Sequence, residues 1–172
     1  IAIKRKNEDI ATRLADDAER EGFEFFIYED VYPAGDEFVL VYEITGRQIP
    51  PGGLPLEVGC VVDNVETIVN LALAMDDKPV TDKYVTICGA VENPITTVVP
   101  IGTPMNDCVE LAGGATVDNA VALTGGLMMG GSTTDLSIPV TKIIGGVIVL
   151  PEDHYLFRRK TQSKEPYTRI GH

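Results

Sequence analysis

The sequence predicts a mixed α/β protein, α+β overall, made of two successive modules, and three observations support this prediction. An amphipathic helical segment lies between two apolar segments within residues 1–28. The apolar, β-branched stretch 58–62 leads directly into a segment with helical spacing. From residue 83 the pattern changes to short strand-like segments separated by glycine and proline turns. With 172 residues, the chain is long enough for one or two domains.

The first module begins with strand–helix–strand order, which is typical of an α/β layer. Residues 1–3 are apolar, and apolar residues then recur at helical spacing as far as residue 20. Asn7 is a candidate N-cap for this helix, and Gly22 is well placed to end it. Residues 23–28 are rich in aromatic side chains and predict the second strand.

The segment 38–44 fits a strand by propensity, but the residues on either side favour a helix. Asp36 can cap its first turn, and Gly46 can end it. Tyr32, Asp36 and Glu37 would then place an aromatic ring and two carboxylates at a helix N-terminus. Neighbouring carboxylates are most often surface charge, so the pair alone is weak evidence for general acid–base catalysis.

The stretch 58–67 predicts a buried strand that ends where the next helix begins. Asp63 or Asn64 can cap this helix, and the Asp63-x-x-Glu66 spacing fits a capping box. The apolar positions of the helix continue to Met75. A strand end beside a helix N-terminus offers free N–H groups and a positive dipole, where polar or anionic cofactor edges bind. A capped helix without any ligand explains the same spacing.

The second module reads as strand, strand, short helix and further strands, which is the order of a β-grasp fold. Residues 84–91 and 96–101 predict a hairpin, and Thr103 or Asn106 is expected to cap the short helix that follows. The remaining predicted strands are residues 121–124 and two short strands within 140–150, broken at Gly145-Gly146; residues 151–172 form a charged tail. We expect the boundary between the modules near residues 80–83.

Composition excludes several classes of function. The formal net charge of −12 argues against a nucleic-acid partner, because phosphates would be repelled. No apolar run is long enough to span a bilayer, and no signal-peptide pattern is present. Cys60, Cys88 and Cys108 lack metal-ligand spacing and are expected to fill the core of a protein in a reducing compartment, and His154 and His172 also lack that spacing. No catalytic residue and no metal ligand is assigned.

Two segments resemble the flavin-carrying subunit of complex I. Residues 62–67 (VDNVET) resemble its V-N-N-V-E-T segment, and residues 32–37 resemble its Y-x-x-G-E-E segment. In that family the two loops lie beside FMN and the NADH that reduces it. The resemblance therefore implies a cofactor site formed by Tyr32, Gly35, Asp36, Glu37, Val62, Asp63, Asn64 and Thr67. Asp63 replaces an asparagine of complex I, and a carboxylate in place of an amide donor would weaken a contact to a flavin carbonyl.

Further segments identify the chain as a member of the RnfC/PduS-like family. They are residues 42–47 (YEITGR), 50–55 (PPGGLP), 124–130 (TGGLMMG) and the closing 150–154, and residues 83–114 resemble the SLBB domain of these proteins. The resemblance implies a partial Rossmann-like α/β domain of the complex I flavin-subunit type in residues 1–82. It also implies a ubiquitin-like β-grasp SLBB domain in residues 83–150, and a tail, 151–172, leading toward an absent iron–sulfur domain.

The function implied by this resemblance is electron transfer from NADH. Electrons would pass through FMN and 4Fe-4S clusters to a downstream acceptor, as in a PduS-like cobalamin reductase or an RnfC-like subunit. The glycine loop that holds the flavin phosphate in this family and its cluster cysteines are missing from the sequence. We therefore expect a central fragment that is inactive by itself and binds FMN weakly or not at all. The expected partners are other electron-transfer subunits or a corrinoid reductase partner, and the expected location is cytoplasmic, membrane-peripheral or inside a microcompartment.

A second hypothesis treats the SLBB segment as a binding module without catalysis of its own. Its ligand would be a corrinoid such as cobalamin, or a partner protein. The candidate contact is Leu127-Met128-Met129, which glycine pairs bracket, because methionine side chains adapt to varied apolar surfaces. The alternative is that these methionines belong to the core. A third possibility is that the module only separates a flavin domain from a cluster domain.

Overall fold

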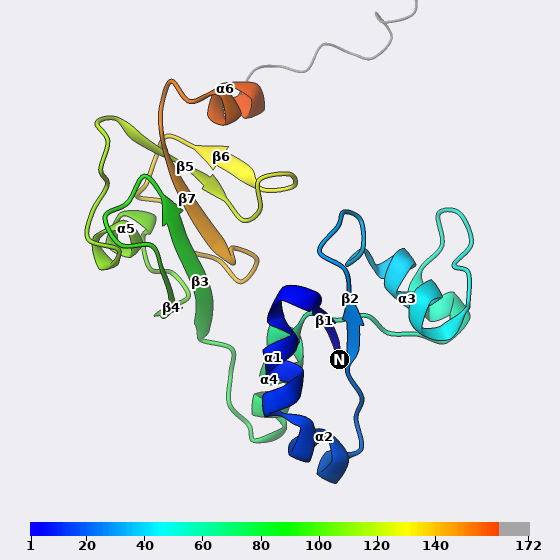
Figure 1. The fold of residues 1–172 in the computed structure, drawn as a ribbon. Coiled ribbons are helices and arrows are strands. Elements are labelled where there is room, and N and C mark those ends of the chain that lie inside the picture. Colours follow the sequence, from blue (N-terminus) through cyan, green and yellow to red (C-terminus); the bar gives the residue numbers. More distant parts are fainter. Residues whose placement is uncertain (162–172) are drawn as a thin grey trace, which may run out of the picture. The chain divides into compact units, whose positions relative to one another are not determined.

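The computed structural model describes residues 1–161, and the chain divides into two compact units, residues 1–68 and 69–172 (Figure 1). The division falls within one helix, α4, after Ile68. The predicted tail from residue 162 onward, including His172, lies outside the described residues.

The first unit begins with the predicted strand–helix–strand order. Strands β1 (Ala2–Lys4) and β2 (Phe26–Tyr28) pair in parallel, with Ile3 opposite Ile27. Between them lie η1 (Arg5–Asn7), α1 (Glu8–Arg13) and α2 (Ala15–Glu21). The expected single helix is thus interrupted at Leu14, whose backbone leaves the helical region. Gly22 ends α2 with a φ of 74°, as predicted, whereas the Asn7 side chain makes no capping bond.

Residues 37–45 form helix α3 (Glu37–Thr45), so the helical interpretation of this apolar segment is confirmed. The Asp36 carboxylate accepts a hydrogen bond from the Phe38 N–H at 2.9 Å and starts the helix. Gly46 ends it with a φ of 71°, a left-handed conformation that residues with a side chain adopt at a cost. Capping chemistry at both ends therefore overrides the strand propensity of this segment.

The predicted strand at 58–62 is wrong. The chain forms a short 3₁₀ helix, η2 (Pro55–Val58), turns at Gly59 in the left-handed region, and runs unpaired to residue 64. The guanidinium of Arg47 donates to the Val58 carbonyl at 2.8 Å and so occupies a group that a strand neighbour would use. Helix α4 (Val65–Met75) then follows, and it ends where the spacing predicted.

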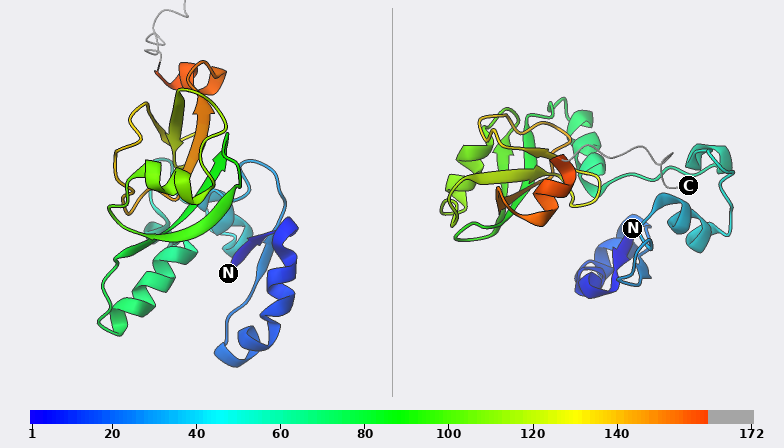
Figure 2. Two further views of the ribbon diagram at one scale, coloured as in Figure 1. Left: turned by 90° about the vertical axis from the view of Figure 1, so that its left-hand side faces the viewer. Right: turned by 90° about the horizontal axis from the view of Figure 1, so that it is seen from above.

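The second unit is built on a five-stranded sheet with the order β4-β3-β7-β5-β6. Strands β3 (Asp82–Gly89) and β4 (Ile95–Pro100) form the predicted antiparallel hairpin. Strand β7 (Gly146–Pro151) lies between β3, which it pairs in parallel, and β5 (Ala120–Thr124), which it pairs antiparallel. Helix α5 (Met105–Leu111) packs on one face, where Met105 and Cys108 join Val85 and Ile87 in the core (Figure 2).

Three details of the second unit differ from the sequence prediction. The two short strands expected in 140–150 are one strand, because residues 140–145 form no strand and turn at Lys142 and Ile143 before β7 begins. Strand β6 (Gly131–Thr133) was not predicted, since three residues give no periodicity. Neither Thr103 nor Asn106 caps α5; Pro104 occupies the N-cap position.

The charged tail contains a helix, α6 (Tyr155–Thr161), that the sequence did not predict. Phe157 anchors it on the second face of the sheet, where it packs with Val121, Leu123 and Leu150. One buried ring in a seven-residue helix leaves no repeating apolar pattern, which explains the missed prediction.

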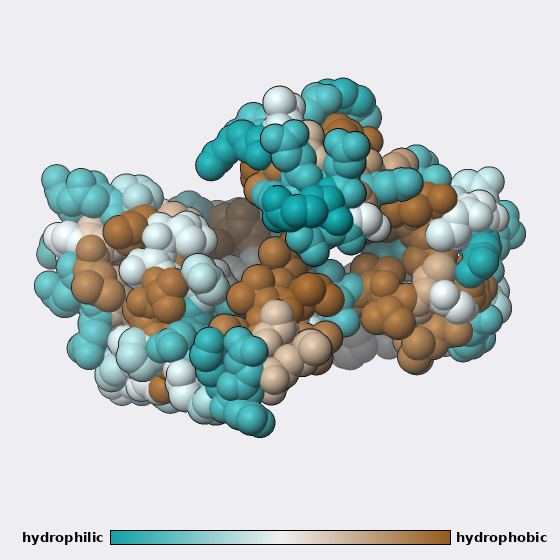
Figure 3. Space-filling view, turned by 90° about the horizontal axis from the view of Figure 1, so that it is seen from below, coloured by the Kyte–Doolittle hydropathy of each residue, from teal (hydrophilic) through white to brown (hydrophobic). Residues whose placement is uncertain are grey.

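The core is distributed unequally between the units. Val41 is the one buried hydrophobic side chain described in residues 1–68, whereas the other sixteen lie between residues 85 and 157. Apolar side chains such as Leu54, Leu56 and Val61 are exposed, and Figure 3 shows brown apolar areas on one face of the molecule. Within the described residues, no helix is long and apolar enough to cross a membrane.

Candidate functional site

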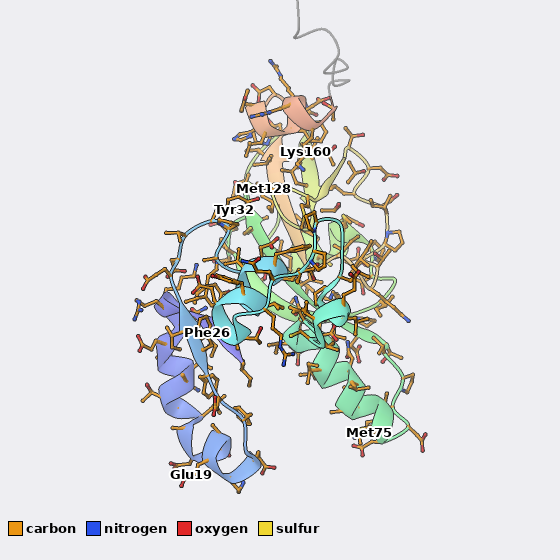
Figure 4. The ribbon with its side chains drawn as sticks, turned by 90° about the vertical axis from the view of Figure 1, so that its right-hand side faces the viewer. Glu19, Phe26, Tyr32, Met75, Met128 and Lys160 are labelled. Atoms are coloured by element: carbon orange, nitrogen blue, oxygen red, sulfur yellow. The ribbon has the colours of Figure 1, made fainter. Side chains whose placement is uncertain are left out.

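The loop that follows β2 carries the first group of predicted site residues. Residues 31–36 form a tight turn in which the N–H groups of Gly35 and Asp36 both donate to the Pro33 carbonyl, at 2.7 and 2.8 Å. The Tyr32–Pro33 peptide bond is cis. Tyr32 is 82% exposed, and Figure 4 shows it on the loop beyond Phe26 of β2. The turn thus presents an aromatic ring to solvent beside a helix N-terminus.

Tyr28 contributes to this turn, although the sequence did not single it out. A Cβ atom added to Gly35 would lie 3.1 Å from the Tyr28 hydroxyl oxygen, so the phenol packs directly over this glycine. Any larger residue at position 35 would displace the ring. The sequence could have indicated Tyr28 only by its position, because it is the last residue of β2 and precedes the loop by a few residues.

Asp36 and Glu37 lie where α3 begins. One oxygen of Asp36 is held by the Phe38 N–H, and no bond to its second oxygen is described in residues 1–161. Glu37 is the acidic residue of the first helical turn. The positive end of the helix dipole stabilises carboxylates here. Both carboxylates are therefore available to accept hydrogen bonds from a ligand.

A cavity of about 370 Å³ lies between β2 and α3, next to this turn. Its wall is apolar except for two carboxylates and a phenol, and it is lined by Phe26, Ile27, Tyr28, Glu29, Val31, Ala34, Val39, Leu40 and Glu43. Val31 and Ala34 come from the loop itself. The cavity and the turn are thus parts of one local structure within the first unit.

The second group of predicted residues lies at the start of α4. Asn64, one of the two candidates, is the cap: its Oδ1 accepts from the Glu66 N–H at 3.2 Å. Its amide nitrogen remains a free donor among the bonds described. Val62, Asp63 and Thr67 are exposed, so their side chains are accessible. The segment does not follow a strand, which differs from the junction that the sequence predicted.

The first four predicted site residues lie on the turn before α3 and at its start, and the other four lie at the start of α4. Among the described residues, no hydrogen bond or ion pair joins Tyr32, Gly35, Asp36 or Glu37 to Val62, Asp63, Asn64 or Thr67. That the two groups surround one cofactor therefore remains a prediction.

The side chains of both segments suit some parts of FMN and NADH and not others. Residues 29–37 and 60–67 contain no lysine or arginine but several carboxylates. Carboxylates accept hydrogen bonds from ribose hydroxyls, and the Asn64 amide can donate to a ring carbonyl. A phosphate would be repelled by the same carboxylates. The residues present thus fit the ring and sugar edges of these cofactors, and the phosphate does not belong here.

The cysteine and histidine side chains in the described part of the chain have structural roles. No group of three histidine, cysteine or acidic side chains within residues 1–161 could hold a metal ion. Cys108 is fully buried, as expected for core filler, and burial raises the pKa of its thiol; Cys60 and Cys88 are only partly buried. The His154 ring accepts from the Leu156 N–H at 3.2 Å and caps α6.

Comparison with known families and curated proteins gives two family matches along the chain. Residues 1–73 match the Nuo51 FMN-binding domain family, and residues 84–132 match the SLBB domain family. The chain is 45% identical to the cobalamin reductase PduS of Salmonella typhimurium over 168 residues, which are 95% of this chain and 36% of that protein. It is 47% identical to the PduS of Citrobacter freundii over 83% of this chain and 32% of that protein.

The C subunit of the proton-translocating ferredoxin:NAD(+) oxidoreductase complex of Clostridium ljungdahlii is 36% identical over 71% of this chain and 27% of its own length. The chain thus spans about a third of the length of these three relatives. Among solved structures, a chain of an NAD⁺-reducing [NiFe]-hydrogenase in the H₂-reduced state matches with a TM-score of 0.68 and 20% identity, over 89% of this chain and 33% of that one. This match concerns the fold.

Proposed function

The chain belongs to the family that includes the cobalamin reductase PduS and the RnfC-type C subunits of ion-translocating oxidoreductase complexes, and from this premise we propose that it forms part of an NADH-oxidising electron-transfer protein. Residues 1–82 would contribute to an FMN- and NADH-binding domain, and residues 83–150 would form the SLBB domain. Residues 151–172 would lead toward an iron–sulfur domain with 4Fe-4S clusters. The acceptor would be a ferredoxin-type protein or a corrinoid.

One observation carries the proposal for the first unit. The turn that packs Gly35 against Tyr28 also places the Asp36-capped start of α3 beside a cavity, within a segment that matches the FMN-binding domain family. One loop thereby holds a glycine, an exposed aromatic ring and two carboxylates next to the cavity. Such a loop can approach a planar ligand closely.

The residues of the two segments would bind and orient the cofactors. Asp36 and Glu37 would accept hydrogen bonds from sugar hydroxyls, Asn64 would donate to a ring carbonyl, and Tyr32 would cover a ring face. Val62 and Thr67 would exclude water from one side. When bound, FMN takes a hydride from NADH and releases electrons to one-electron acceptors. Tyr28 would support the loop and would not touch the ligand.

The test is saturation-transfer NMR of the whole chain with NADH and with FMN, which detects weak binding. We expect dissociation constants in the millimolar range, about 4 kcal/mol of binding free energy, because the phosphates have no cationic partner in these segments. Tyr32→Ala and Asn64→Ala should reduce the transferred signal several-fold. Asp9→Ala, an exposed carboxylate of α1, is the control. Micromolar FMN binding would contradict the phosphate argument, and unchanged signal in both variants would overturn the site.

The second candidate function is a binding module in the second unit. The observation that favours it is the exposure of Leu127, Met128 and Met129, which rules out a core role for these side chains. A corrinoid ligand is tested by absorbance titration of cobalamin into the whole chain. A shift of its bands that Met128→Ser and Met129→Ser abolish would support ligand binding, and an unchanged spectrum would oppose it.

Location and partners follow the same family premise. The relatives named as C subunits belong to multi-subunit oxidoreductase complexes. We propose that this chain acts with other electron-transfer subunits in the cytoplasm, at a membrane surface or in a bacterial microcompartment.

A further inference from the structure

Strand β4 has an edge that no neighbouring strand occupies. It is the outermost strand of the five-stranded sheet on the β3 side and pairs with β3 alone (Figure 1). The strand at the other end of the sheet, β6, has only three residues. By contrast, β4 has six residues and no charged side chain, although sheet edges are ordinarily kept short or charged to prevent pairing with another chain. An uncharged edge of this length can therefore accept a further strand.

The pairing of the β3–β4 hairpin determines which backbone groups of β4 point away from β3. One position beyond the ladder, the Ile101 N–H donates to the Thr81 carbonyl at 2.8 Å, which marks a hydrogen-bonded pair. Such pairs alternate along an antiparallel ladder, so residues 95, 97 and 99 bond to β3, whereas residues 96, 98 and 100 point outward. Thr86 lies opposite Thr96 and accordingly donates its N–H away from β4, to the Gly145 carbonyl at 3.1 Å.

Prolines restrict the outward hydrogen-bonding groups to the middle of β4. Pro94 and Pro100 flank this stretch and have no N–H, and the Pro100 carbonyl already accepts from the N–H and the hydroxyl of Thr103, at 3.1 and 2.8 Å. The outward donors are thus the N–H groups of Thr96 and Val98, and the outward acceptors are their carbonyls. Within residues 1–161, no backbone hydrogen bond to these outward groups is described. Because donors and acceptors are arranged symmetrically about the residue between them, this edge is complementary to itself.

We propose that two copies of this chain associate through β4, paired antiparallel about a two-fold axis at Thr97. In this register Thr96 exchanges hydrogen bonds with Val98 of the second copy, and all of the outward donors and acceptors find partners. Thr97 faces Thr97, and Ile95 faces Val99, so the opposed side chains are β-branched, as suits adjacent strands. A register centred on Thr96 or on Val98 would set one of these residues against a proline and lose bonds.

Charge and area determine how strong this association is. Each copy carries a net charge of −12, so two copies repel each other, but β4 itself contributes no charge at the line of contact. Ile95 and Val98 are 41% and 48% exposed and lose apolar surface to water in the dimer. One strand pair buries less than the roughly 1,200 Å² of a stable interface, so the dimer is weak. Salt strengthens it by screening the repulsion. This association is independent of cofactor binding by the first unit.

The first test measures self-association of the whole chain by sedimentation velocity and by hydrogen-exchange NMR. We expect a monomer–dimer equilibrium with a dissociation constant on the order of 100 μM, which tightens several-fold as the salt concentration is raised. The amide protons of Thr96 and Val98 should exchange more slowly as the chain concentration rises, whereas that of Ile143, in an exposed turn, should not change. A chain that stays monomeric, or a dimer that leaves both amides unprotected, would overturn the proposal.

A cross-linking test examines the register. In the proposed dimer the two Thr97 residues form a non-hydrogen-bonded pair with Cα atoms about 4.5 Å apart, within the range that a disulfide spans. In a chain with Cys60 and Cys88 replaced by serine, Thr97→Cys should therefore form a covalent dimer with glutathione disulfide, seen on a non-reducing gel. Val98→Cys is the control, because its two copies lie diagonally about 7–8 Å apart and should cross-link several-fold less. Equal or stronger cross-linking of Val98→Cys would overturn the proposed register.

A matched pair of charge variants separates the β4 contact from general repulsion. Val98→Glu places a carboxylate in the middle of the proposed interface and should weaken dimerisation about tenfold. Ile143→Glu adds the same charge at a side chain that is 90% exposed in the turn before β7, and it should dimerise like the wild type. Circular dichroism melts establish that both variants are folded. Equal weakening by the two variants would overturn the proposal, as would a monomeric wild-type chain whose β4 pairs only with a strand of a different protein.

Discussion

The guanidinium of Arg47 donates to the backbone carbonyl of Val58 at 2.8 Å and closes the proline- and glycine-rich loop between α3 and α4. Its Nη1 also lies 3.3 Å from where a Cβ of Gly59 would be. This bond sets the path along which the chain leaves one predicted site segment and approaches the other.

Replacing Arg47 with methionine should loosen this loop. The substitution keeps the aliphatic stem and removes the donor, which costs about 1 kcal/mol locally for an exposed bond to a charged group. We expect faster amide hydrogen exchange and faster proteolysis at residues 48–60, measured by mass spectrometry. Arg13→Met is the control on α1 and should leave these residues unchanged. Equal exchange in both variants would contradict a role for the bond.

Gly89 and Gly114 offer a matched test of close packing in the sheet. Their φ angles are +90° and +91°, but a Cβ at Gly89 would overlap the Val149 carbonyl oxygen, whereas nothing lies near Gly114. Gly114→Ala should cost about 1 kcal/mol of unfolding free energy, from backbone strain alone. Gly89→Ala should cost about 1–3 kcal/mol more, because β3 and β7 must separate. Urea denaturation measures both, and equal costs would contradict the overlap.

The thiol of Cys108 should resist alkylation in the folded chain. It is fully buried, and burial raises its pKa, so the reactive thiolate is disfavoured. At pH 8, iodoacetamide should modify the partly buried Cys60 and Cys88 first, as read by peptide mass spectrometry. All three should react in urea. Rapid labelling of Cys108 without denaturant would show that the core opens.

The raised pKa of Cys108 also determines the direction in which the stability of the fold changes with pH. Above the ordinary thiol pKa the unfolded chain loses a proton that the folded chain keeps, so the unfolding free energy falls as pH rises through this window. Cys108→Ala should remove that part of the slope. An unchanged slope would assign it to other groups.

The two units should differ in their ability to fold alone. One buried hydrophobic side chain, Val41, cannot offset the conformational entropy of residues 1–68, whereas residues 76–161 contain the five-stranded sheet and its core. Calorimetry should show a cooperative transition for 76–161 and none for 1–68. A cooperative transition in 1–68 would contradict this conclusion.

The sequence predicted a helix correctly where a capping residue and the helical spacing of apolar residues agreed. Asp36 and Gly46 fixed α3 against its strand propensity, and the apolar spacing after Asn64 fixed α4 to Met75. The β3–β4 hairpin followed from alternation and the turn at Asn93-Pro94. These features depend on neighbours within a few residues, which a sequence displays directly.

The failures of prediction have long-range causes. Val58 to Val62 has strand composition, but no strand lies beside it, and Arg47 occupies its carbonyl. Helix α6 depends on Phe157 meeting a sheet that is formed by distant residues. The exposure of Met129 depends on a loop closed by Gly130 and Lys160, thirty residues apart. For the site, the sequence indicated the two segments, but the contribution of Tyr28 depends on how the folded loop places Gly35 against its ring.

The position of β7 in the sheet has a consequence for synthesis of the protein. This strand is the last of the five along the chain, yet it lies between β3 and β5 and bonds to both. While the chain grows on a ribosome, the inner edges of β3 and β5 have no partner until Pro151 has been made. At about 5–20 residues per second, the 62 residues from Ala90 to Pro151 take about 3–12 s. The nascent chain therefore exposes two adhesive strand edges for seconds, a period in which chaperone binding or mispairing competes with folding.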